Sequence, residues 1–202
     1  CVNEKDFQRE KNLILDSQRS IPQDCLFIYF STCSVMRPIC DHSPYIKHKI
    51  NMESVVNNYS PSLVVRLPQV SGFNGNSENL LNFIIRSIKN NKEISIWQNA
   101  ERNLLDVDDL SRIIEKISEL KDYSNKTITV ANPQSYKVID IVRLAEKVTG
   151  RDAIKKIERK GEEINNSESE FLLDETILEI ILECNPDLSK ESYIENLIKK
   201  YS

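Results

Sequence analysis

The segment at residues 26–52 limits the possible folds of this chain more than any other part of the sequence. It begins with a run of bulky apolar residues at 26–30, whose length fits one buried strand of a parallel sheet. Small, mostly hydroxylated residues follow at 31–34, where this strand is expected to end. Ser43 and Pro44 then form a helix start with proline in the first turn. Because ligands of open α/β sheets bind beyond the carboxyl ends of the strands, a binding site is expected at 31–34.

Tyr45 and Lys49 lie four residues apart in the helix that this start predicts, so both side chains project from one face. A lysine ammonium near a phenol stabilises the phenolate and lowers its pKa from about 10. A tyrosine tuned in this way can exchange a proton with a substrate hydroxyl near neutral pH. The spacing alone is also that of a solvated helix face. Only the ordered combination of strand, hydroxyl residues, loop and helix favours a catalytic site.

The composition excludes several classes of protein. A chain of 202 residues corresponds to one domain, or to one domain with a small lobe. The net charge of -4, with both signs interspersed, argues against nucleic acid as the main partner. The apolar runs are too short to cross a bilayer and no signal peptide opens the sequence, so no membrane association is expected. Five cysteines without a Cys-x-x-Cys pair indicate reduced thiols and a cytoplasmic location.

Two groups of residues could be taken for metal ligands. His42 and His48 have no companion ligands at metal spacing. Asp106, Asp108 and Asp109 form an acidic trio, but neither the glycine turn nor the further ligands of a calcium-binding loop follow them. We therefore expect no metal site.

Helical and strand patterns alternate along the chain, which favours an α/β fold. Gly150 is expected to end one helix as a C-cap, and Asp109 is expected to cap another at its start. A loop is expected at 161–169. Helices are expected at 10–19, 43–59, 79–89, 110–120, 136–148, 172–183 and 190–200, and further strands at 62–67, 93–97 and 127–131.

The order of strand, hydroxyl cluster, loop, tyrosine and lysine resembles the short-chain dehydrogenase/reductase superfamily, and specifically its extended group of NAD(P)-dependent nucleotide-sugar epimerases, dehydratases and reductases. Matching residues 31–35 to the family pattern Ser-Ser/Thr-x-x-Val places the catalytic hydroxyl on Thr32. Tyr45 and Lys49 fall on the other two catalytic positions. The resemblance implies that Tyr45 removes a proton from a sugar hydroxyl and that Thr32 hydrogen-bonds the same oxygen. Lys49 would hold the nicotinamide ribose of NAD or NADP, with Tyr45 beside it.

Two further segments resemble the family. Residues 66–72 look like its Arg-x-x-Asn-x-x-Gly segment, which implies that Leu67 and Pro68 lie beside the nicotinamide. Residues 102–110 are similar to Arg-Asp-x-Ile-x-Val-x-Asp-Leu, whose arginine meets the substrate diphosphate, and a guanidinium can bind phosphate oxygens bidentately. A turn, a helix cap and a core tryptophan would explain most of the same residues without a ligand. The substrate-binding residues that the resemblance implies are Gln69, Asn79, Leu80, Trp97 and Arg102.

The fold implied by the resemblance is the C-terminal part of a Rossmann-like parallel sheet with a small α/β substrate-binding lobe. The nucleotide-binding core would comprise residues 1–72 and 104–133, and the lobe would comprise residues 73–103 and 134–202.

The glycines do not form the Gly-rich turn with which dinucleotide-binding domains bind pyrophosphate. They are Gly72, Gly75, Gly150 and Gly161. We therefore expect a fragment that lacks the N-terminal strands, since an open sheet without its central strands would expose apolar edges. The other explanation is a natural protein that has lost this half. In that case the chain would be a cofactor-free binding or scaffold protein that keeps the fold without turnover.

The expected activity is that of an NAD(P)-dependent nucleotide-sugar epimerase or ketosugar reductase. The 4,6-dehydratases of the family carry Asp-Glu directly after the catalytic threonine, which supplies acid and base for the loss of water. Here these positions are Cys33 and Ser34, which argues against dehydration. The sugar, the nucleotide and the choice between NAD and NADP stay open at this level.

A homodimer is the expected assembly. In relatives, the helices that correspond to residues 10–19 and 49–59 pair across a dimer interface, and Val55 is among the apolar positions that we expect to be exposed on them. Light scattering of the purified protein should give the mass of a dimer. The mass of a monomer would contradict this assembly.

Overall fold

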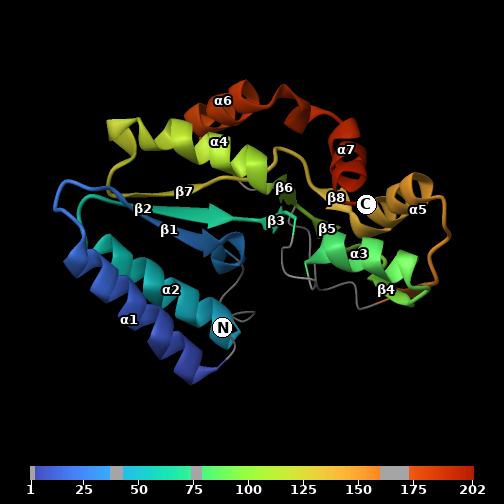
Figure 1. The fold of residues 1–202 in the computed structure, drawn as a ribbon, viewed down its shortest axis with the longest axis horizontal. Coiled ribbons are helices and arrows are strands. Elements are labelled where there is room, and N and C mark those ends of the chain that lie inside the picture. Colours follow the sequence, from blue (N-terminus) through green and yellow to red (C-terminus); the bar gives the residue numbers. More distant parts are fainter. Residues whose placement is uncertain (1–2, 37–42, 74–78, 160–172) are drawn as a thin grey trace. The chain divides into compact units, whose positions relative to one another are not determined.

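The structure is a computed structural model that describes residues 3–36, 43–73, 79–159 and 173–202. The chain divides into two compact units (Figure 1). The first unit is Cys1–Leu67 with Ile114–Val130, and the second is Pro68–Ile113 with Ala131–Ser202. Each unit is described by itself below. The assignment of residues to a nucleotide-binding core and a substrate-binding lobe stays a prediction.

The first unit contains a parallel sheet of three strands in the order β1-β2-β7. The central strand, β2 (Ser62–Leu67), pairs on one side with β1 (Phe27–Thr32) and on the other with β7 (Lys126–Thr129). Its residues Leu63, Val64 and Val65 are fully buried, as expected for a strand covered on both faces. The predicted parallel α/β architecture is confirmed. The strand predicted at 26–30 extends to Thr32, so the hydroxyl residues belong to its carboxyl end.

Helices α1 (Glu4–Ser20) and α2 (Pro44–Asn57) lie side by side next to this sheet (Figure 1). The predicted start of α2 is confirmed, because the Ser43 side chain accepts a hydrogen bond from the backbone N–H of Ile46. Helix α1 begins six residues earlier than predicted, at a cap formed by Asn3, whose side chain accepts from the N–H of Asp6.

A cluster of buried side chains joins these helices to the sheet. Val55 is partly buried against this cluster. The prediction that Val55 is an exposed apolar residue is therefore wrong, because its side chain packs inward beside the core. The residues of the cluster are Ile14, Tyr29, Met52, Val56 and Val64.

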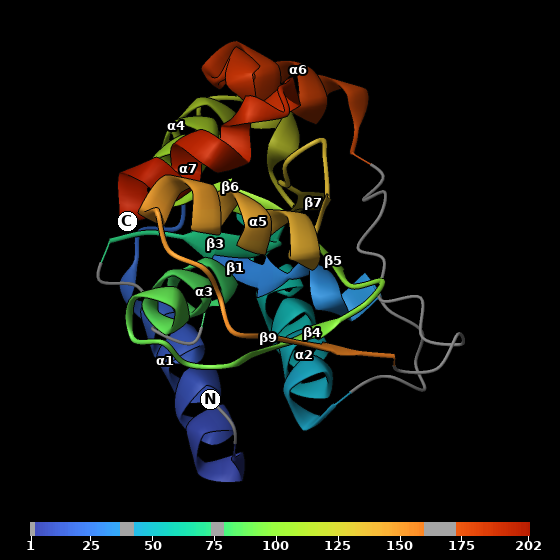
Figure 2. The same cartoon turned by 90° about the vertical axis from the view of Figure 1, so that its right-hand side faces the viewer.

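In the second unit, helix α5 lies against α3 and α7 (Figure 2). Gly150 ends α5 with a positive φ of 65°, which confirms the predicted C-cap. Two strand pairs are parallel, β3 with β6 and β4 with β9, and β5 pairs with β8 antiparallel. The elements are β3 (Gln69–Ser71), α3 (Leu80–Lys89), β4 (Ile94–Trp97), β5 (Glu101–Arg102), β6 (Leu104–Asp106), β8 (Tyr136–Lys137), α5 (Val138–Thr149), β9 (Lys155–Glu158), α6 (Glu175–Cys184) and α7 (Ser192–Tyr201). The described residues also form helix α4 (Val107–Ser118) and the short 3-10 helices η1 (Cys33–Met36), η3 (Lys121–Tyr123) and η4 (Pro186–Ser189).

Two local predictions are wrong. Asp109 does not cap α4, since the helix begins at Val107 and the side chain of Asp106 accepts from the N–H of Asp108. Strand β9 was not expected, because its charged sequence, Lys155–Glu158, lacks the apolar alternation of a half-buried strand. The loop predicted at 161–169 lies outside the described residues.

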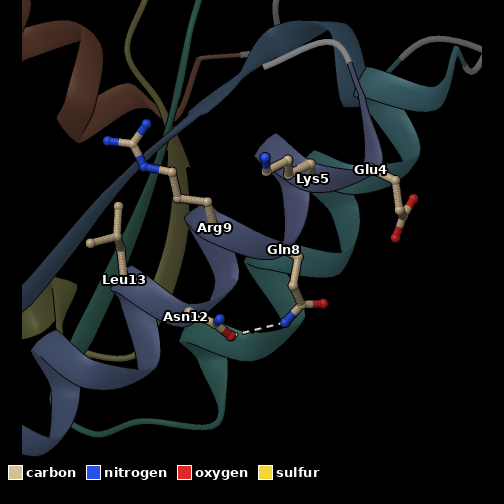
Figure 3. A pocket seen from close by; sticks show the side chains of 6 residues that line it. All are labelled: Glu4, Lys5, Gln8, Arg9, Asn12 and Leu13. Carbon is tan, nitrogen blue, oxygen red and sulfur yellow. Dashed lines mark hydrogen bonds between the residues drawn. The ribbon is translucent and has the colours of Figure 1, made fainter.

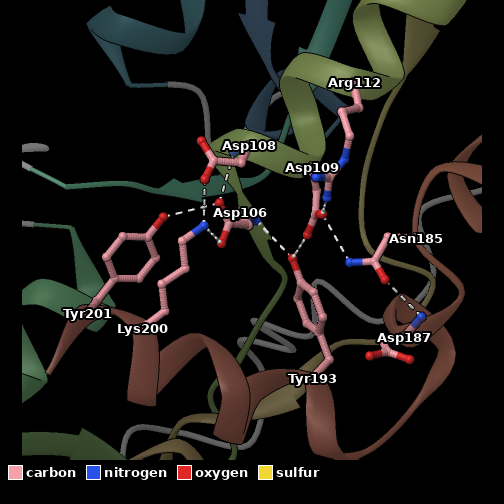
Figure 4. A network of polar contacts seen from close by, with 9 residues as sticks. All are labelled: Asp106, Asp108, Asp109, Arg112, Asn185, Asp187, Tyr193, Lys200 and Tyr201. Atoms are coloured by element: carbon pink, nitrogen blue, oxygen red, sulfur yellow. Dashed lines mark hydrogen bonds and ion pairs between the residues drawn. The ribbon is translucent and has the colours of Figure 1, made fainter.

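Helix α7 binds the acidic segment where β6 meets α4 (Figure 4). The hydroxyl of Tyr193 donates to Asp109 Oδ2 at 2.7 Å and accepts from the N–H of Asp106 at 2.9 Å. The ammonium of Lys200 donates to Asp106 Oδ2 at 2.6 Å and to Asp108 Oδ2 at 2.7 Å. Asp106 and Asp109 are buried, so these partners satisfy carboxylates that would otherwise be costly to remove from water.

The same contacts shift the pKa of the groups on α7. Burial, together with the charge of Asp106 and a hydrogen bond to it, raises the pKa of Tyr201 to about 12. Burial alone would lower the pKa of Lys200, but its bonds to Asp106 and Asp108 outweigh burial and raise it. Both groups therefore keep their protons throughout the neutral range.

Replacing Tyr193 by Phe should lower the free energy of unfolding by about 2 kcal/mol, because it leaves a buried carboxylate oxygen and a buried N–H without their partner. Denaturant unfolding measures this change. Tyr136→Phe is the control, since the Tyr136 hydroxyl donates to Gln134 Oε1 over 3.5 Å, a longer bond than either of those made by the Tyr193 hydroxyl, and its loss should cost less. Equal stability of Tyr193→Phe and the wild type would contradict the role given to this hydroxyl.

Candidate functional site

Thr32 is the last residue of β1, at the carboxyl end of the parallel sheet. Its Oγ1 accepts a hydrogen bond of 3.2 Å from the N–H of Ser34, which tightens the turn into η1. Cys33 is buried directly after Thr32. The side chain of Thr32 is half-buried, which leaves a hydroxyl at the mouth of the strand, where ligands of open α/β sheets bind.

Tyr45 and Lys49 lie on successive turns of α2, and the ammonium of Lys49 has two partners from other elements. It donates to Glu10 Oε1 on α1 at 2.8 Å and to the hydroxyl oxygen of Tyr29 on β1 at 2.8 Å. The Tyr29 hydroxyl in turn donates to the same Glu10 oxygen at 2.9 Å. Lys49, Glu10 and Tyr29 thus form a closed triangle of hydrogen bonds.

The second oxygen of Glu10 is also bound. Its Oε2 lies 2.9 Å from Nε2 of His48, and the ring of His48 stacks on that of Phe7 with centroids 4.2 Å apart. Burial alone would raise the pKa of Glu10, but the bonds from Lys49, His48 and Tyr29 lower it to about 2. Glu10 is therefore an anion at neutral pH, with three partners on two elements, α2 and β1.

The pKa of Tyr45 moves in the direction opposite to that expected from the Tyr-x-x-x-Lys spacing. Tyr45 keeps 38% of its surface exposed, yet burial of the remainder raises its pKa and the negative charge of Glu10 raises it further. The expectation failed because the charge of Lys49 is balanced by a carboxylate that lies 39 residues away in the sequence. In this arrangement Tyr45 holds its proton at neutral pH.

A second polar group at the sheet was missed by the sequence analysis. Glu53 is buried one helical turn beyond Lys49 and accepts two hydrogen bonds from Arg66 on β2, at 3.1 and 2.7 Å. Its Oε1 also accepts from Ser31 at 2.5 Å. The only signal in the sequence is the Lys49–Glu53 spacing, which is typical of a surface ion pair on a helix.

The predicted cofactor- and substrate-binding residues divide between the two units. Leu67 ends β2 in the first unit, and Pro68 is the first residue of the second. All five predicted substrate-binding residues belong to the second unit. They are Gln69, Asn79, Leu80, Trp97 and Arg102.

Gln69 differs from the other predicted substrate-binding residues in having an unsatisfied polar atom. Its side-chain oxygen is buried and, among the described residues, has no hydrogen-bond partner. By contrast, Asn79 Nδ2 donates to the backbone oxygen of Val70 at 2.9 Å, and Arg102 donates to that of Glu101 at 2.6 Å. A buried acceptor without a donor costs about 1–3 kcal/mol, so Gln69 is the residue best explained by a ligand.

Asn103 and Asn132, which the sequence analysis did not single out, fix the backbone beside Arg102. Both are buried. Asn103 donates to the oxygen of Asn132 at 2.8 Å and accepts from its N–H at 3.0 Å, and Asn132 Nδ2 donates to the oxygen of Leu104 at 3.3 Å. These bonds hold the backbone directly after Arg102.

A surface depression on α1 does not qualify as the site (Figure 3). Gln8 and Asn12 within it bond to each other at 2.9 Å. Because one helix supplies the whole lining, the depression cannot enclose a ligand as binding pockets do. The lining residues are Glu4, Lys5, Gln8, Arg9, Asn12 and Leu13.

Two other features, a metal-binding cluster and a membrane-spanning helix, are absent from the described residues. No three side chains of His, Cys, Asp or Glu gather there in a way that could hold a metal ion. No helix described here combines the length and the apolar character needed to cross a membrane.

Comparison with protein families identifies the chain. Residues 23–131, over half of the sequence, match the family described as NAD dependent epimerase/dehydratase. The chain belongs to this family. A comparison with curated proteins found no matching sequence.

Solved structures of epimerases and dehydratases share the fold. UDP-glucuronic acid 4-epimerase from Bacillus cereus in complex with NAD is 23% identical, with a TM-score of 0.66 over 78% of this chain and 58% of that one. dTDP-glucose 4,6-dehydratase from Bacillus anthracis in complex with NAD is 15% identical, with a TM-score of 0.61 over 77% and 54%. An epimerase from the methanogen Methanothermobacter thermautotrophicus is 16% identical, with a TM-score of 0.70 over 98% and 68%. The chain thus spans little more than half the length of the first two.

The bonds to Glu10 should make stability depend on pH at the acidic end. The folded pKa of about 2 lies below the ordinary value of 4.5, so the contribution is fully present above about pH 4.5 and is lost as the pH falls through about 2. The unfolding free energies of the wild type and Glu10→Gln should therefore differ at pH 6 and converge toward pH 2. A constant difference over this range would contradict the assignment.

Proposed function

We propose that the protein acts as an NAD(P)-dependent nucleotide-sugar epimerase or ketosugar reductase, with Tyr45 as the residue that exchanges the proton. The observation that carries the proposal is the placement of Thr32 at the carboxyl end of β1 and of Tyr45 in the first turn of α2, which packs on that strand. Membership of the NAD dependent epimerase/dehydratase family supports the same conclusion.

In this proposal Thr32 and Tyr45 act on one substrate oxygen. The Thr32 hydroxyl hydrogen-bonds the oxygen and orients it, and the Tyr45 hydroxyl gives a proton to it or, as the phenolate, takes one from it. The raised pKa of Tyr45 favours the protonated form at rest, which is the form that donates to a ketone oxygen. This supports the reductive direction. Oxidation of a hydroxyl would require that the Tyr45 phenolate be stabilised first.

A nicotinamide cofactor would supply the hydride acceptor or donor. The residues that would hold it are Lys49 and Tyr45, with Leu67 and Pro68 beside the nicotinamide. The donor set fits ribose hydroxyls, since a lysine ammonium has three N–H donors and only two of those of Lys49 have partners among the described residues. The solved relatives named above support this choice, because two of them were solved with NAD.

A nucleotide sugar is the substrate class that we propose. The buried, unsatisfied oxygen of Gln69 can accept from a sugar hydroxyl or amide. The guanidinium of Arg102 suits a diphosphate, and Asn79 and Leu80 begin α3, whose N-terminus favours negative charge. UDP-glucuronic acid and dTDP-glucose appear in the names of the relatives, so uridine and thymidine diphosphate sugars are the first to test.

The test compares the wild type with Tyr45→Phe on a panel of nucleotide sugars. Turnover is monitored by nicotinamide fluorescence. Loss of the phenol hydroxyl should reduce turnover by at least about 100-fold, the usual contribution of a general acid-base group, and should leave substrate binding intact. Unchanged turnover would remove Tyr45 as the proton-exchanging residue. Binding of sugar nucleotides without turnover in the wild type would favour a cofactor-free binding or scaffold protein instead.

A further inference from the structure

The mechanism proposed above gives no role to Glu10, yet this carboxylate is the centre of the polar contacts around Lys49. Both of its oxygens are engaged, Oε1 by Lys49 and Tyr29 and Oε2 by His48. The side chain of Glu10 is 20% exposed and that of Lys49 is 13% exposed. Water screens such a pair less than one on the open surface.

We propose that Glu10 is a positioning residue that holds the ammonium of Lys49 in a resting arrangement, and that Tyr45 becomes competent for proton exchange only when Lys49 leaves this carboxylate. The inference rests on the proposed function in one respect, the role given to Tyr45. Its geometrical basis is the closed triangle of Lys49, Glu10 and Tyr29, whose three bonds measure 2.8, 2.8 and 2.9 Å.

The charges around Tyr45 explain why the position of Lys49 matters. A phenolate is stabilised by a nearby cation and destabilised by a nearby anion. Glu10 pairs with the ammonium of Lys49, one helical turn beyond Tyr45, and its negative charge adds to the cost of ionising Tyr45. Moving the ammonium from Glu10 toward Tyr45 would instead stabilise the phenolate form of Tyr45. The carboxylate thus controls how much of the charge of Lys49 reaches Tyr45.

Other charged groups near the cluster do not offer the same control. Glu53 is bound to Arg66 by two hydrogen bonds, so these two charges balance each other. His48 is held against Glu10 and stacked on Phe7. The titratable and charged groups that face Tyr45 and Lys49 from the described elements are Glu10 on α1, Tyr29 on β1, His48 and Glu53 on α2, and Arg66 on β2.

The triangle also explains the presence of a tyrosine within β1. The hydroxyl of Tyr29 both accepts from Lys49 and donates to Glu10, so it fixes the distance between the two charged groups. Burial, and then the bond to Glu10 and its charge, raise the pKa of Tyr29, which keeps it a donor. Phe at this position would keep the packing in the core and remove the two bonds made by the hydroxyl, leaving only the bond between Lys49 and Glu10.

The test measures the pKa of Tyr45 directly, by carbon NMR of the protein with ¹³C at the tyrosine hydroxyl carbon, and Tyr45→Phe assigns the signal. In Glu10→Gln the pKa of Tyr45 should fall by about one unit, because an anion is removed and the ammonium is released. Glu4→Gln is the matched control, an exposed carboxylate on the same helix, and should leave the signal unchanged. The same pKa in Glu10→Gln and wild type would overturn the inference.

Tyr29→Phe keeps the experiment decisive if Glu10→Gln fails to fold. This variant loosens Lys49 without changing any charge, and should lower the pKa of Tyr45 by a smaller amount than Glu10→Gln. The same pKa of Tyr45 in Tyr29→Phe and the wild type would also count against the inference.

The NMR titration needs neither cofactor nor turnover, so it separates this inference from the proposed function. If the pKa of Tyr45 is unchanged in Glu10→Gln and Tyr45→Phe loses turnover, only the role of Glu10 is rejected. If the pKa of Tyr45 falls in Glu10→Gln and Tyr45→Phe keeps full turnover, the proposed function is rejected and the effect of Glu10 on the phenol stands. In active protein, Glu10→Gln should also move the pH dependence of turnover downward by the same amount.

Discussion

The ion pair between Lys49 and Glu10 is the interaction on which the chemistry of the first unit depends. A lysine one helical turn from a tyrosine is expected to lower the pKa of the phenol, but only if the cation is not already neutralised. Here a carboxylate from another helix takes up that charge at 2.8 Å. The result is a tyrosine that holds its proton, on a helix that packs against β1, the strand that ends at Thr32.

The fold provides both parts of this arrangement. Parallel pairing of β1 with β2 places their carboxyl ends at the same edge of the sheet, and α2 packs against both strands. Helix α1 lies beside α2 and brings Glu10 within 2.8 Å of the ammonium of Lys49. In the second unit, the paired Asn103 and Asn132 hold the backbone next to Arg102, and Tyr193 and Lys200 bind the acidic segment that follows. Both units therefore hold their candidate residues by buried polar contacts.

Much of the fold could be predicted from the sequence because its signals are local. The apolar run before Ser31, the Ser43–Pro44 helix start and the glycine after Thr149 each determine the conformation of a few neighbouring residues. One error arose where two local signals compete. Asp106 and Asp109 are both suitable caps for α4, and only the structure shows that Asp106 takes this position.

The contacts of the candidate site were harder to predict, because they join residues that are far apart in the sequence. Nothing near Glu10 indicates that it binds a lysine 39 residues later, and an isolated glutamate on a helix is typical of a solvated face. The same holds for Tyr193 and Asp109, which are separated by 84 residues. The order of strand, hydroxyl residues, tyrosine and lysine can thus suggest the family while leaving the ionisation of the tyrosine undetermined. The claim that Glu10 holds the charge of Lys49 away from Tyr45 is tested most directly by the pKa of Tyr45 with and without bound NADPH or NADH. A fall on binding is predicted, as Lys49 exchanges Glu10 for the ribose, and an unchanged pKa in the saturated complex would contradict it.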